Sequence, residues 1–594
     1  MPDATARAAE LWAFLIVEEL VRHGVSHFFA APGSRSTPLI LAAARNPKAV
    51  LHMHVDERGT AFQALGYGRM AGRAAAWVTT SGTALANGYP AVVEAALEQV
   101  PMILLTADRP PELRDAGANQ TIRQTGIFSP HVAWETDLPV PTADINPAFV
   151  LTTVSHAVWR SAEGPVHVNA MFREPLHIAS AAGQPHPPIP THLNAWWESG
   201  APYTRQLSGS GSGPVTGVIS DAERTLAELI AAARRPLVVL GRMPVRPFTE
   251  WSAAWASGNV PVLPDVASQF RHPGPGDADG ARPFITHYDA LLRDRERWPQ
   301  LAPDLVIQVG RPPVSKRLKS FLKDAQAVTV VLDDSRGRLD PDHQTRYRIH
   351  IRPGDALDLL GQLLPYTKAP ADWSQTWVRL DEVAADWMSR SLGHPDTLSE
   401  QAVVREAVRR FPPDTPLILA SSNTIRHADT FSDGSVPRRW VVCNRGASGI
   451  DGTIATAAGA AVASHTRASV ILGDLALLHD LNSLALADNL TILVVNNDGG
   501  GIFSLLPIAR EEDVFEPWFG TPHGRTFRAA ADLFDLAWYN PKTMPELIQA
   551  LEHARTASKG VLIEVTTDRT ETARAQSDAL AGLQASLRAE IPLP

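Results

Sequence analysis

The chain has 594 residues, of which 44% are hydrophobic and 20% are charged. This composition is typical of a globular protein, and the length is too great for a single core, so about three domains are expected. The formal net charge of −9 and the lack of a basic run argue against a nucleic-acid partner. The single cysteine, Cys443, excludes an intrachain disulfide and favours a reducing cytoplasm. No uninterrupted apolar run is long enough to predict a membrane span.

The first 180 residues alternate helical and strand patterns. A helix is expected from residue 11 to 20, with a stop at Gly24. Strands are expected at 25–30, 49–55, 74–80 and 101–106. Strands that alternate with helices predict a parallel, doubly wound sheet.

The rest of the chain repeats this alternation twice after a break. Residues 184–215 are rich in Pro, His, Gly and Ser, which is typical of a linker. Further strands are expected at 236–241, 305–310, 328–333, 417–420, 440–443, 469–472, 491–495 and 560–565. The sequence therefore predicts three doubly wound α/β domains, at 1–183, 216–365 and 375–594, and the first and third look similar in plan.

Two expected strands of the third domain end in polar residues. One is followed by Gly473 and Asp474, and the other by Asn496, Asn497 and Asp498. If the strands are parallel neighbours, these residues share the sheet edge where α/β proteins bind ligands. Their oxygens suit Mg²⁺, which often bridges to phosphates. A helix cap and an ordinary turn are the alternative interpretation, and these residues alone leave both open.

The first domain offers a second candidate site. Glu57 sits where a strand enters a helix, as a capping acid or a functional carboxylate. Small residues follow it, including Gly59, Gly66 and Gly68, and allow close approach of another helix or backbone, as at a tight subunit interface. The segment TTSGT, residues 79–83, ends a strand with hydroxyls and a glycine, a shape suited to cradling a ligand.

Together these stretches resemble thiamine-diphosphate-dependent enzymes, with a pyrimidine-binding domain first and a diphosphate- and metal-binding motif at 473–501. The segments PGSRSTP, HxHxDERG, TADRPPELRDAGANQTIRQ, NRGASGIDG and NNDGGGIFSLLP occur in that order. They are similar to the 2-succinyl-5-enolpyruvyl-6-hydroxy-3-cyclohexene-1-carboxylate synthase family of menaquinone biosynthesis. Leu475, in place of a second motif glycine, and a short spacer before the Asn pair resemble the same family. Asp498 stands where a third Asn is often seen.

The resemblance implies a transferase that decarboxylates 2-oxoglutarate on thiamine diphosphate and adds the succinyl semialdehyde carbanion to isochorismate. It implies that Glu57 contacts the pyrimidine ring and that Ile450 keeps the cofactor bent. Mg²⁺, or Mn²⁺ in its place, would be held by Asp474, Asn497 and the carbonyl of Gly499. Other cofactor contacts are implied for Thr80, Ser81, Gly82, Ser448, Gly449, Gly473, Leu475 and Ile502.

The two implied substrates carry four carboxylates between them, so several cations are expected despite the acidic net charge. Arginine is preferred where a planar carboxylate is held at two points. The resemblance implies catalytic roles for Arg35, Arg426 and Arg445 beside Glu57. It implies substrate contacts for Ser34, Arg35, Arg109, Asn119, Gln120, Lys316, Arg317, Ser422, Arg426, Arg445, Phe503 and Leu506. The alternative for any single arginine is an ordinary ion pair.

Two other functions remain open at this point. One is another thiamine-diphosphate carboligase or decarboxylase, and the arginines argue against it because pyruvate needs only one carboxylate partner. The other is a non-catalytic, ligand-sensing paralogue, which would have no need of Glu57. In this superfamily two subunits share each cofactor, so a cytoplasmic homodimer or homotetramer is expected, without nucleic-acid or membrane partners.

Overall fold

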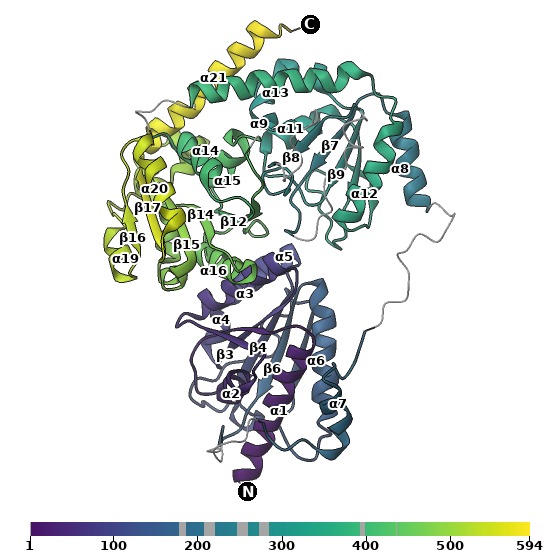
Figure 1. The fold of residues 1–594 in the computed structure, drawn as a ribbon, viewed down its shortest axis with the longest axis vertical. Helices are drawn as coiled ribbons and strands as arrows, with labels where there is room; N and C mark the ends of the chain where they lie inside the picture. The colour runs from purple at the N-terminus through teal and green to yellow at the C-terminus, as the bar shows by residue number, and fades with distance from the viewer. Residues whose placement is uncertain are drawn as a thin grey trace. The chain divides into compact units, whose positions relative to one another are not determined.

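The computed structural model describes residues 2–177, 186–206, 220–245, 259–272, 284–392, 398–434 and 436–593. These residues form three sheets with helices packed around them (Figure 1), and every pairing between named strands is parallel. The predicted α/β class with three parallel sheets is confirmed. The expected domain ends at 183 and 215 lie outside the described residues. None of the helices described is long and apolar enough to cross a membrane.

The first sheet has the strand order β2-β1-β3-β4-β6-β5. Its strands are β1 (His27–Ala30), β2 (Val50–Met53), β3 (Ala75–Thr79), β4 (Met102–Asp108), β5 (Trp134–Leu138) and β6 (Pro165–Met171). Its main helices are α1 (Pro2–Arg22), α2 (Thr37–Arg45), α3 (Glu57–Ala71), α4 (Thr83–Asn87), α5 (Tyr89–Glu98) and α6 (Ala148–Arg160). The four predicted strands are present, and β5 and β6 were not predicted.

The second sheet has the order β11-β10-β9-β7-β8. Its strands are β7 (Pro236–Leu240), β8 (Val262–Pro264), β9 (Leu305–Val309), β10 (Val328–Leu332) and β11 (Thr345–Ile349). Its helices include α8 (Asp221–Ala232), α9 (Tyr288–Leu291), α11 (Lys316–Ala325) and α12 (Pro353–Leu363), and α13 (Ala371–Ser391) follows.

The third sheet has the order β13-β12-β14-β15-β17-β16, which is the order of the first sheet strand for strand. Its strands are β12 (Pro416–Leu419), β13 (Trp440–Val442), β14 (Ala468–Gly473), β15 (Leu490–Asn496), β16 (Ala537–Tyr539) and β17 (Val561–Thr566). Its helices include α14 (Glu400–Arg410), α15 (Asn423–Phe431), α17 (Asp474–His479), α20 (Met544–Thr556) and α21 (Arg569–Glu590). The predicted similarity of the first and third sheets is thereby confirmed.

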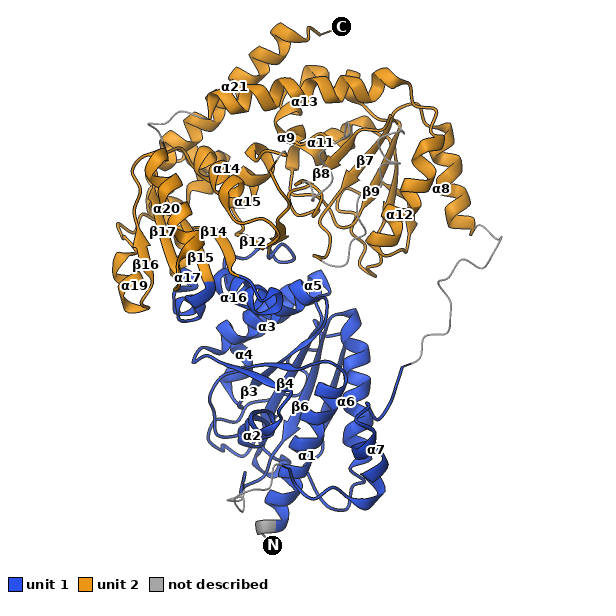
Figure 2. Ribbon diagram, in the orientation of Figure 1, with its two compact units in different colours: residues 1–211, 444–466, 479–489 blue, residues 212–443, 467–478, 490–594 orange. Residues whose placement is uncertain are grey.

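The chain divides into two compact units that do not follow sequence order (Figure 2). Unit 1 comprises residues 1–211, 444–466 and 479–489, and unit 2 comprises 212–443, 467–478 and 490–594. Helix α16 (Thr453–Ser464) therefore belongs to unit 1, where it packs against α3.

The contact between α3 and α16 is made by backbone. A Cβ on Gly66 would lie 2.0 Å from the carbonyl oxygen of Thr456, and one on Gly459 would lie 1.9 Å from that of Gln63. The small residues of α3 thus allow another helix to approach closely, as the sequence predicted, and that helix comes from the same chain.

Part of the expected linker is folded onto unit 1. A 3-10 turn (Thr191–Leu193) and α7 (Asn194–Ser199) follow one another, and Trp196 is 5% exposed. The Trp196 indole donates to Glu19 at 2.9 Å, and Arg22 donates to the Ala201 carbonyl at 3.0 Å. This part of 184–215 is packed structure because its tryptophans cover α1.

Candidate functional site

The first sheet places two candidate turns side by side. Its strand order reverses between β1 and β3, which is the position where doubly wound sheets bind ligands. The turn after β1 carries Ser34, which is exposed, and Arg35, whose N–H donates to the Thr80 hydroxyl after β3 at 3.2 Å. A Cβ on Gly33 would meet the Thr80 side chain at 2.3 Å, so the turns are in contact.

Two buried arginines lie at this edge. Arg35 is 5% exposed, donates to the Phe172 carbonyl at 2.8 Å and pairs with Glu174 at 2.9 Å. Arg109, which follows β4, is 8% exposed. Burial lowers the pKa of Arg109, and the positive charge of Arg35 lowers it further. Within the described residues, Arg35 Nε and Arg109 Nη1 are buried donors without a partner.

The segment after Arg109 folds over the turn at residues 80–82. Gln120 donates to the Ser81 carbonyl at 2.9 Å, and the Ser81 hydroxyl donates to the Gln120 carbonyl at 3.2 Å. Gln124, which was not predicted, is buried and accepts from the Gly82 N–H at 3.0 Å. It ends the TADRPPELRDAGANQTIRQ segment, so the signal for it was present in the sequence. Asn119 is exposed.

Glu57 is the first residue of α3 and is half-buried. The helix cap is its neighbour Asp56, whose carboxylate accepts from the Arg58 N–H at 2.9 Å. The capping role that the sequence left open for Glu57 therefore belongs to Asp56. The Glu57 carboxylate is not needed to cap the start of the helix.

The loop between β13 and α16 carries four predicted residues. Buried Glu94 of α5 fixes it by accepting from the N–H groups of Gly446 at 3.0 Å and Ala447 at 2.7 Å. Arg445 is half-buried, and its buried Nε has no partner within the described residues. The remaining three are Ser448, exposed with a φ of +61°, and half-buried Gly449 and Ile450. All of them belong to unit 1.

In unit 2, Asp474 lies at the edge that the sequence predicted. Strands β14 and β15 are parallel neighbours with Gly473 opposite Val495. The Asp474 carboxylate is buried, and it accepts from the N–H of Leu475 at 2.7 Å and of Gly499 at 2.9 Å. His523 Nε2 lies 3.1 Å away, a contact that the sequence did not reveal. Burial raises the pKa of Asp474, and these hydrogen bonds oppose the rise.

The loop after β15 presents oxygen atoms beside Asp474. Asn497 donates through Nδ2 to Glu400 at 2.7 Å, and its buried Oδ1 has no partner among the described residues. Gly499 has a φ of +129°, and a Cβ there would lie 1.9 Å from the Gly520 carbonyl, so only glycine fits. The Asp498 carboxylate is engaged by the N–H groups of His523 at 2.8 Å and Gly524 at 2.7 Å.

The predicted substrate residues of unit 2 lie on several elements. Ile502 and Phe503 are half-buried in the 3-10 turn Gly501–Leu505, Phe503 stacks edge-on against Phe519 at 5.7 Å, and Leu506 is 41% exposed. Ser422 precedes α15, and its carbonyl accepts from Arg426. Lys316 is exposed, whereas Arg317 is paired with buried Asp289. Arg317 therefore already has the ordinary ion pair that the sequence kept open as its alternative.

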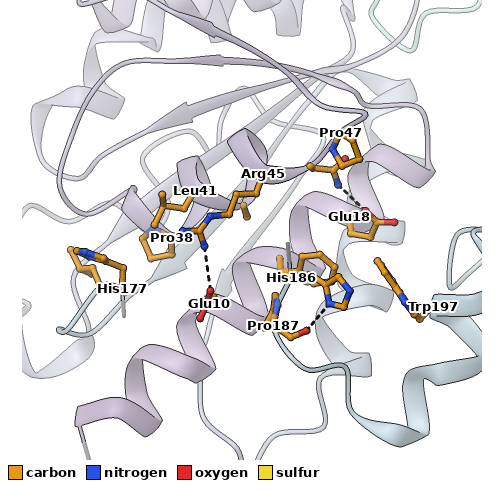
Figure 3. Close-up of a pocket in the computed structure, with 14 residues that line it drawn as sticks. Glu10, Glu18, Pro38, Leu41, Arg45, Pro47, His177, His186, Pro187 and Trp197 are labelled. Atoms are coloured by element: carbon orange, nitrogen blue, oxygen red, sulfur yellow. Dashed lines mark hydrogen bonds and ion pairs between the residues drawn. The ribbon is translucent and has the colours of Figure 1, made fainter. Parts of the chain in front are cut away.

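No group of three or more His, Cys, Asp or Glu side chains positioned to hold a metal occurs in the described part of the chain. The metal ligands predicted from the sequence are one carboxylate, one side-chain amide oxygen and one backbone carbonyl. They therefore do not form a group of this kind. A pocket of about 260 Å³ lies elsewhere, in unit 1 between α1, α2 and α7 (Figure 3). Its lining is mainly apolar, and none of the predicted site residues belongs to it. Arg45 points toward Glu10 across the pocket, with Arg45 Nη1 3.4 Å from Glu10 Oε1.

Two family models match parts of the chain. Residues 12–127 match the family described as thiamine pyrophosphate enzyme, N-terminal TPP binding domain. Residues 189–419 match the middle domain of thiamine pyrophosphate enzymes.

Three relatives match over nearly the whole chain, and each of the three is named 2-succinyl-5-enolpyruvyl-6-hydroxy-3-cyclohexene-1-carboxylate synthase. The Rubrobacter xylanophilus protein is 47% identical over 98% of this chain and 100% of its own. The Salinibacter ruber protein is 43% identical over 94% of both chains. The Chlorobium phaeobacteroides protein is 38% identical over 94% of this chain and 95% of its own. The chain therefore belongs to the 2-succinyl-5-enolpyruvyl-6-hydroxy-3-cyclohexene-1-carboxylate synthase family of thiamine-diphosphate-dependent enzymes.

Proposed function

We propose that this protein releases carbon dioxide from 2-oxoglutarate and joins the remaining succinyl unit to isochorismate, which gives the product in the family name. Thiamine diphosphate, when bound, supplies the electron sink for such a decarboxylation. Glu57 is the group that exchanges a proton with the pyrimidine ring, because it is half-buried and is not used as a helix cap.

The observation that carries the substrate assignment is the set of unpartnered guanidinium donors. Arg35 Nε, Arg109 Nη1 and Arg445 Nε are buried without a partner among the described residues. Leaving a buried N–H of a charged group unpaired is costly, so these positions favour an anionic ligand. The case is weaker for Arg35 than for Arg109 and Arg445, because Arg35 already pairs with Glu174. A pair of substrates that carries four carboxylates supplies such anions, whereas pyruvate carries one.

The diphosphate would be bound through Mg²⁺, with Mn²⁺ as a substitute. Asp474, Asn497 Oδ1 and the Gly499 carbonyl are hard oxygen donors of the kind that Mg²⁺ prefers. The buried, unpaired Oδ1 of Asn497 supports this assignment, because a cation would satisfy it. The proposed cofactor contacts are completed by Gly473, Leu475, Ile502, the turn at residues 80–82, and Ser448, Gly449 and Ile450.

A coupled assay tests the function. Purified protein with thiamine diphosphate, Mg²⁺ and both substrates is expected to release carbon dioxide and to consume isochorismate in equal amounts. Carbon dioxide release that is unaffected by isochorismate would instead indicate a simple decarboxylase. The proposal would be contradicted if the protein released no carbon dioxide and consumed no isochorismate.

The active assembly would be at least a homodimer. Glu57 and Asp474 lie in different units of the chain, and in this superfamily each cofactor is shared by two subunits. Sedimentation of the active enzyme is expected to give a dimer or a larger even assembly, and a fully active monomer would contradict this.

A further inference from the structure

We propose that Glu400 is a positioning residue that fixes the side-chain amide of Asn497 so that its oxygen, and not its nitrogen, faces the metal. This inference rests on the proposed function of the Asp474 site. No motif in the sequence singled out Glu400, and the predicted roles do not use it.

Glu400 is a buried carboxylate with three polar neighbours. It is the first residue of α14, follows the N-cap Ser399, and its side chain is 3% exposed. One oxygen accepts from Asn497 Nδ2 at 2.7 Å, and the other lies 3.2 Å from His427 Nε2 on α15. Thr572 of α21 also bonds to it. The Glu400 carboxylate therefore connects the start of α14, where it lies, with α15, α21 and the loop after β15.

The chemistry of a carboxylate selects one orientation of the amide. An ionised carboxylate accepts hydrogen bonds and donates none, whereas an asparagine side chain has one accepting and one donating end. Glu400 therefore binds the NH₂ end, and the Oδ1 end is turned away from it. That oxygen is the buried atom that lacks a partner among the described residues.

Packing holds the amide in the same place. A Cβ on Gly501 would lie 2.5 Å from Asn497 Nδ2, so only a glycine leaves room for this rotamer. Groups that orient a metal ligand from behind typically change metal affinity by about 10–100-fold when they are removed. Glu400 and Gly501 stand in that relation to Asn497.

The first test is a titration of the enzyme with Mn²⁺ in the presence of thiamine diphosphate and without substrate, followed by electron paramagnetic resonance. Glu400→Gln is expected to weaken Mn²⁺ binding about 10–100-fold, because an amide can present either end to Asn497. Excess metal is expected to restore most of kcat. Glu406→Gln is the matched control, since Glu406 lies on the same helix but pairs with Arg410, and its Mn²⁺ affinity is expected to equal that of the native enzyme.

A double-variant cycle separates positioning from a merely structural role. Asn497→Ala removes the amide that Glu400 orients, so adding Glu400→Gln to it is expected to change Mn²⁺ affinity by less than about twofold, whereas the same change in the native enzyme weakens binding. An equal loss of Mn²⁺ affinity in both backgrounds, or a Glu400→Gln variant with native Mn²⁺ affinity, would overturn the inference. If the native enzyme itself binds no Mn²⁺, the proposed metal site fails, and the inference fails with it.

Discussion

At the level of single residues, the proposed chemistry depends most on Glu57. Glu57→Gln keeps the shape of the side chain but removes the exchangeable proton of the acid. It is expected to bind thiamine diphosphate normally and to lower kcat by about 10²–10⁴-fold. Cofactor binding followed by calorimetry and turnover from carbon dioxide release check both parts.

The neighbouring Asp56→Asn is the control for this experiment. Asparagine caps a helix as well as aspartate does, so α3 is expected to remain intact and turnover to stay close to native. Near-native turnover in Glu57→Gln would refute the role assigned to Glu57.

Arg109 tests the proposed recognition of carboxylates. Arg109→Lys keeps the charge but loses the planar fork, and a hydrogen bond to a charged group contributes about 1.5–3 kcal/mol. The KM for one of the two substrates is therefore expected to rise about 10–100-fold.

Arg123→Lys provides the comparison, because the Arg123 side chain is 86% exposed and pairs at 3.3 Å with the exposed Asp115. Its KM values are expected to stay within about twofold of native. Equal KM values in the two variants would remove Arg109 from the substrate site.

The sequence predicted the residues that lie directly after strands, because a motif and a strand end coincide there. Asp474 and Arg35 are examples. It did not single out Glu400 or His523, which come from distant parts of the chain. Glu400 of α14 contacts Asn497, and His523, in the segment after residue 520, contacts Asp474. Such contacts depend on packing between elements, which no local pattern records.

At the level of elements, the contact between α3 and α16 is the most sensitive to size. In Gly66→Ala the new methyl group would lie 2.0 Å from the Thr456 carbonyl, so the helices must separate. Overpacking of this kind costs about 1–3 kcal/mol, and the Tm of unit 1 is expected to fall by several degrees.

Gly337→Ala is the control for this change, because the nearest atom to a Cβ there is 3.9 Å away. Differential scanning calorimetry of both variants decides the matter. Equal Tm values would mean that the α3 and α16 backbones can relax without cost.

Strand β6 carries a buried histidine that links stability to pH. His167 is 1% exposed and lies 2.8 Å from the Thr106 hydroxyl, and burial lowers its pKa to about 4. The unfolded chain binds this proton near pH 6.5 and the folded chain only near 4, so stability is lost as the pH falls through that window. The full effect is about 3 kcal/mol in unfolding free energy.

His167→Gln removes the titrating group. The unfolding free energy of this variant is therefore expected to fall less between pH 6.5 and 4 than that of the native protein. Chemical unfolding at several pH values measures the difference. The exposed His192→Gln variant is expected to follow the native profile. A His167→Gln variant with the native pH dependence would show that the histidine does not control acid stability.

The strands with continuous apolar runs were predicted within one or two residues, whereas β5, β6, β8, β11 and β16 were not predicted. Strand β6 reads PVHVNAM, and its His and Asn interrupt the apolar pattern although all seven residues are buried. Both polar side chains bond to Thr106 inside the sheet. The fold around α7 escaped prediction for a related reason, since the Pro and Gly around it are typical of linkers.

For the whole molecule, the proposed sharing of cofactors between subunits has a direct genetic test. Glu57→Gln and Asp474→Asn are each expected to be inactive alone. If each site combines Glu57 of one subunit with Asp474 of the other, a mixed dimer contains one intact site and one site in which both residues are changed. An equal co-expression of both chains is then expected to recover about a quarter of native activity.

If both residues of a site come from the same subunit, mixed dimers have no intact site and recover nothing. Activity of the co-expressed pair, corrected for the measured proportion of mixed dimers, distinguishes the two arrangements.

The discontinuous make-up of unit 1 also has a consequence for how the protein is made. Helix α3 ends at residue 71, but α16, which covers its small-residue face, begins only at residue 453. Ribosomes add about 5–20 residues per second, so this face waits on the order of tens of seconds for its partner. The nascent chain must keep that surface from wrong partners until most of the protein has been synthesised.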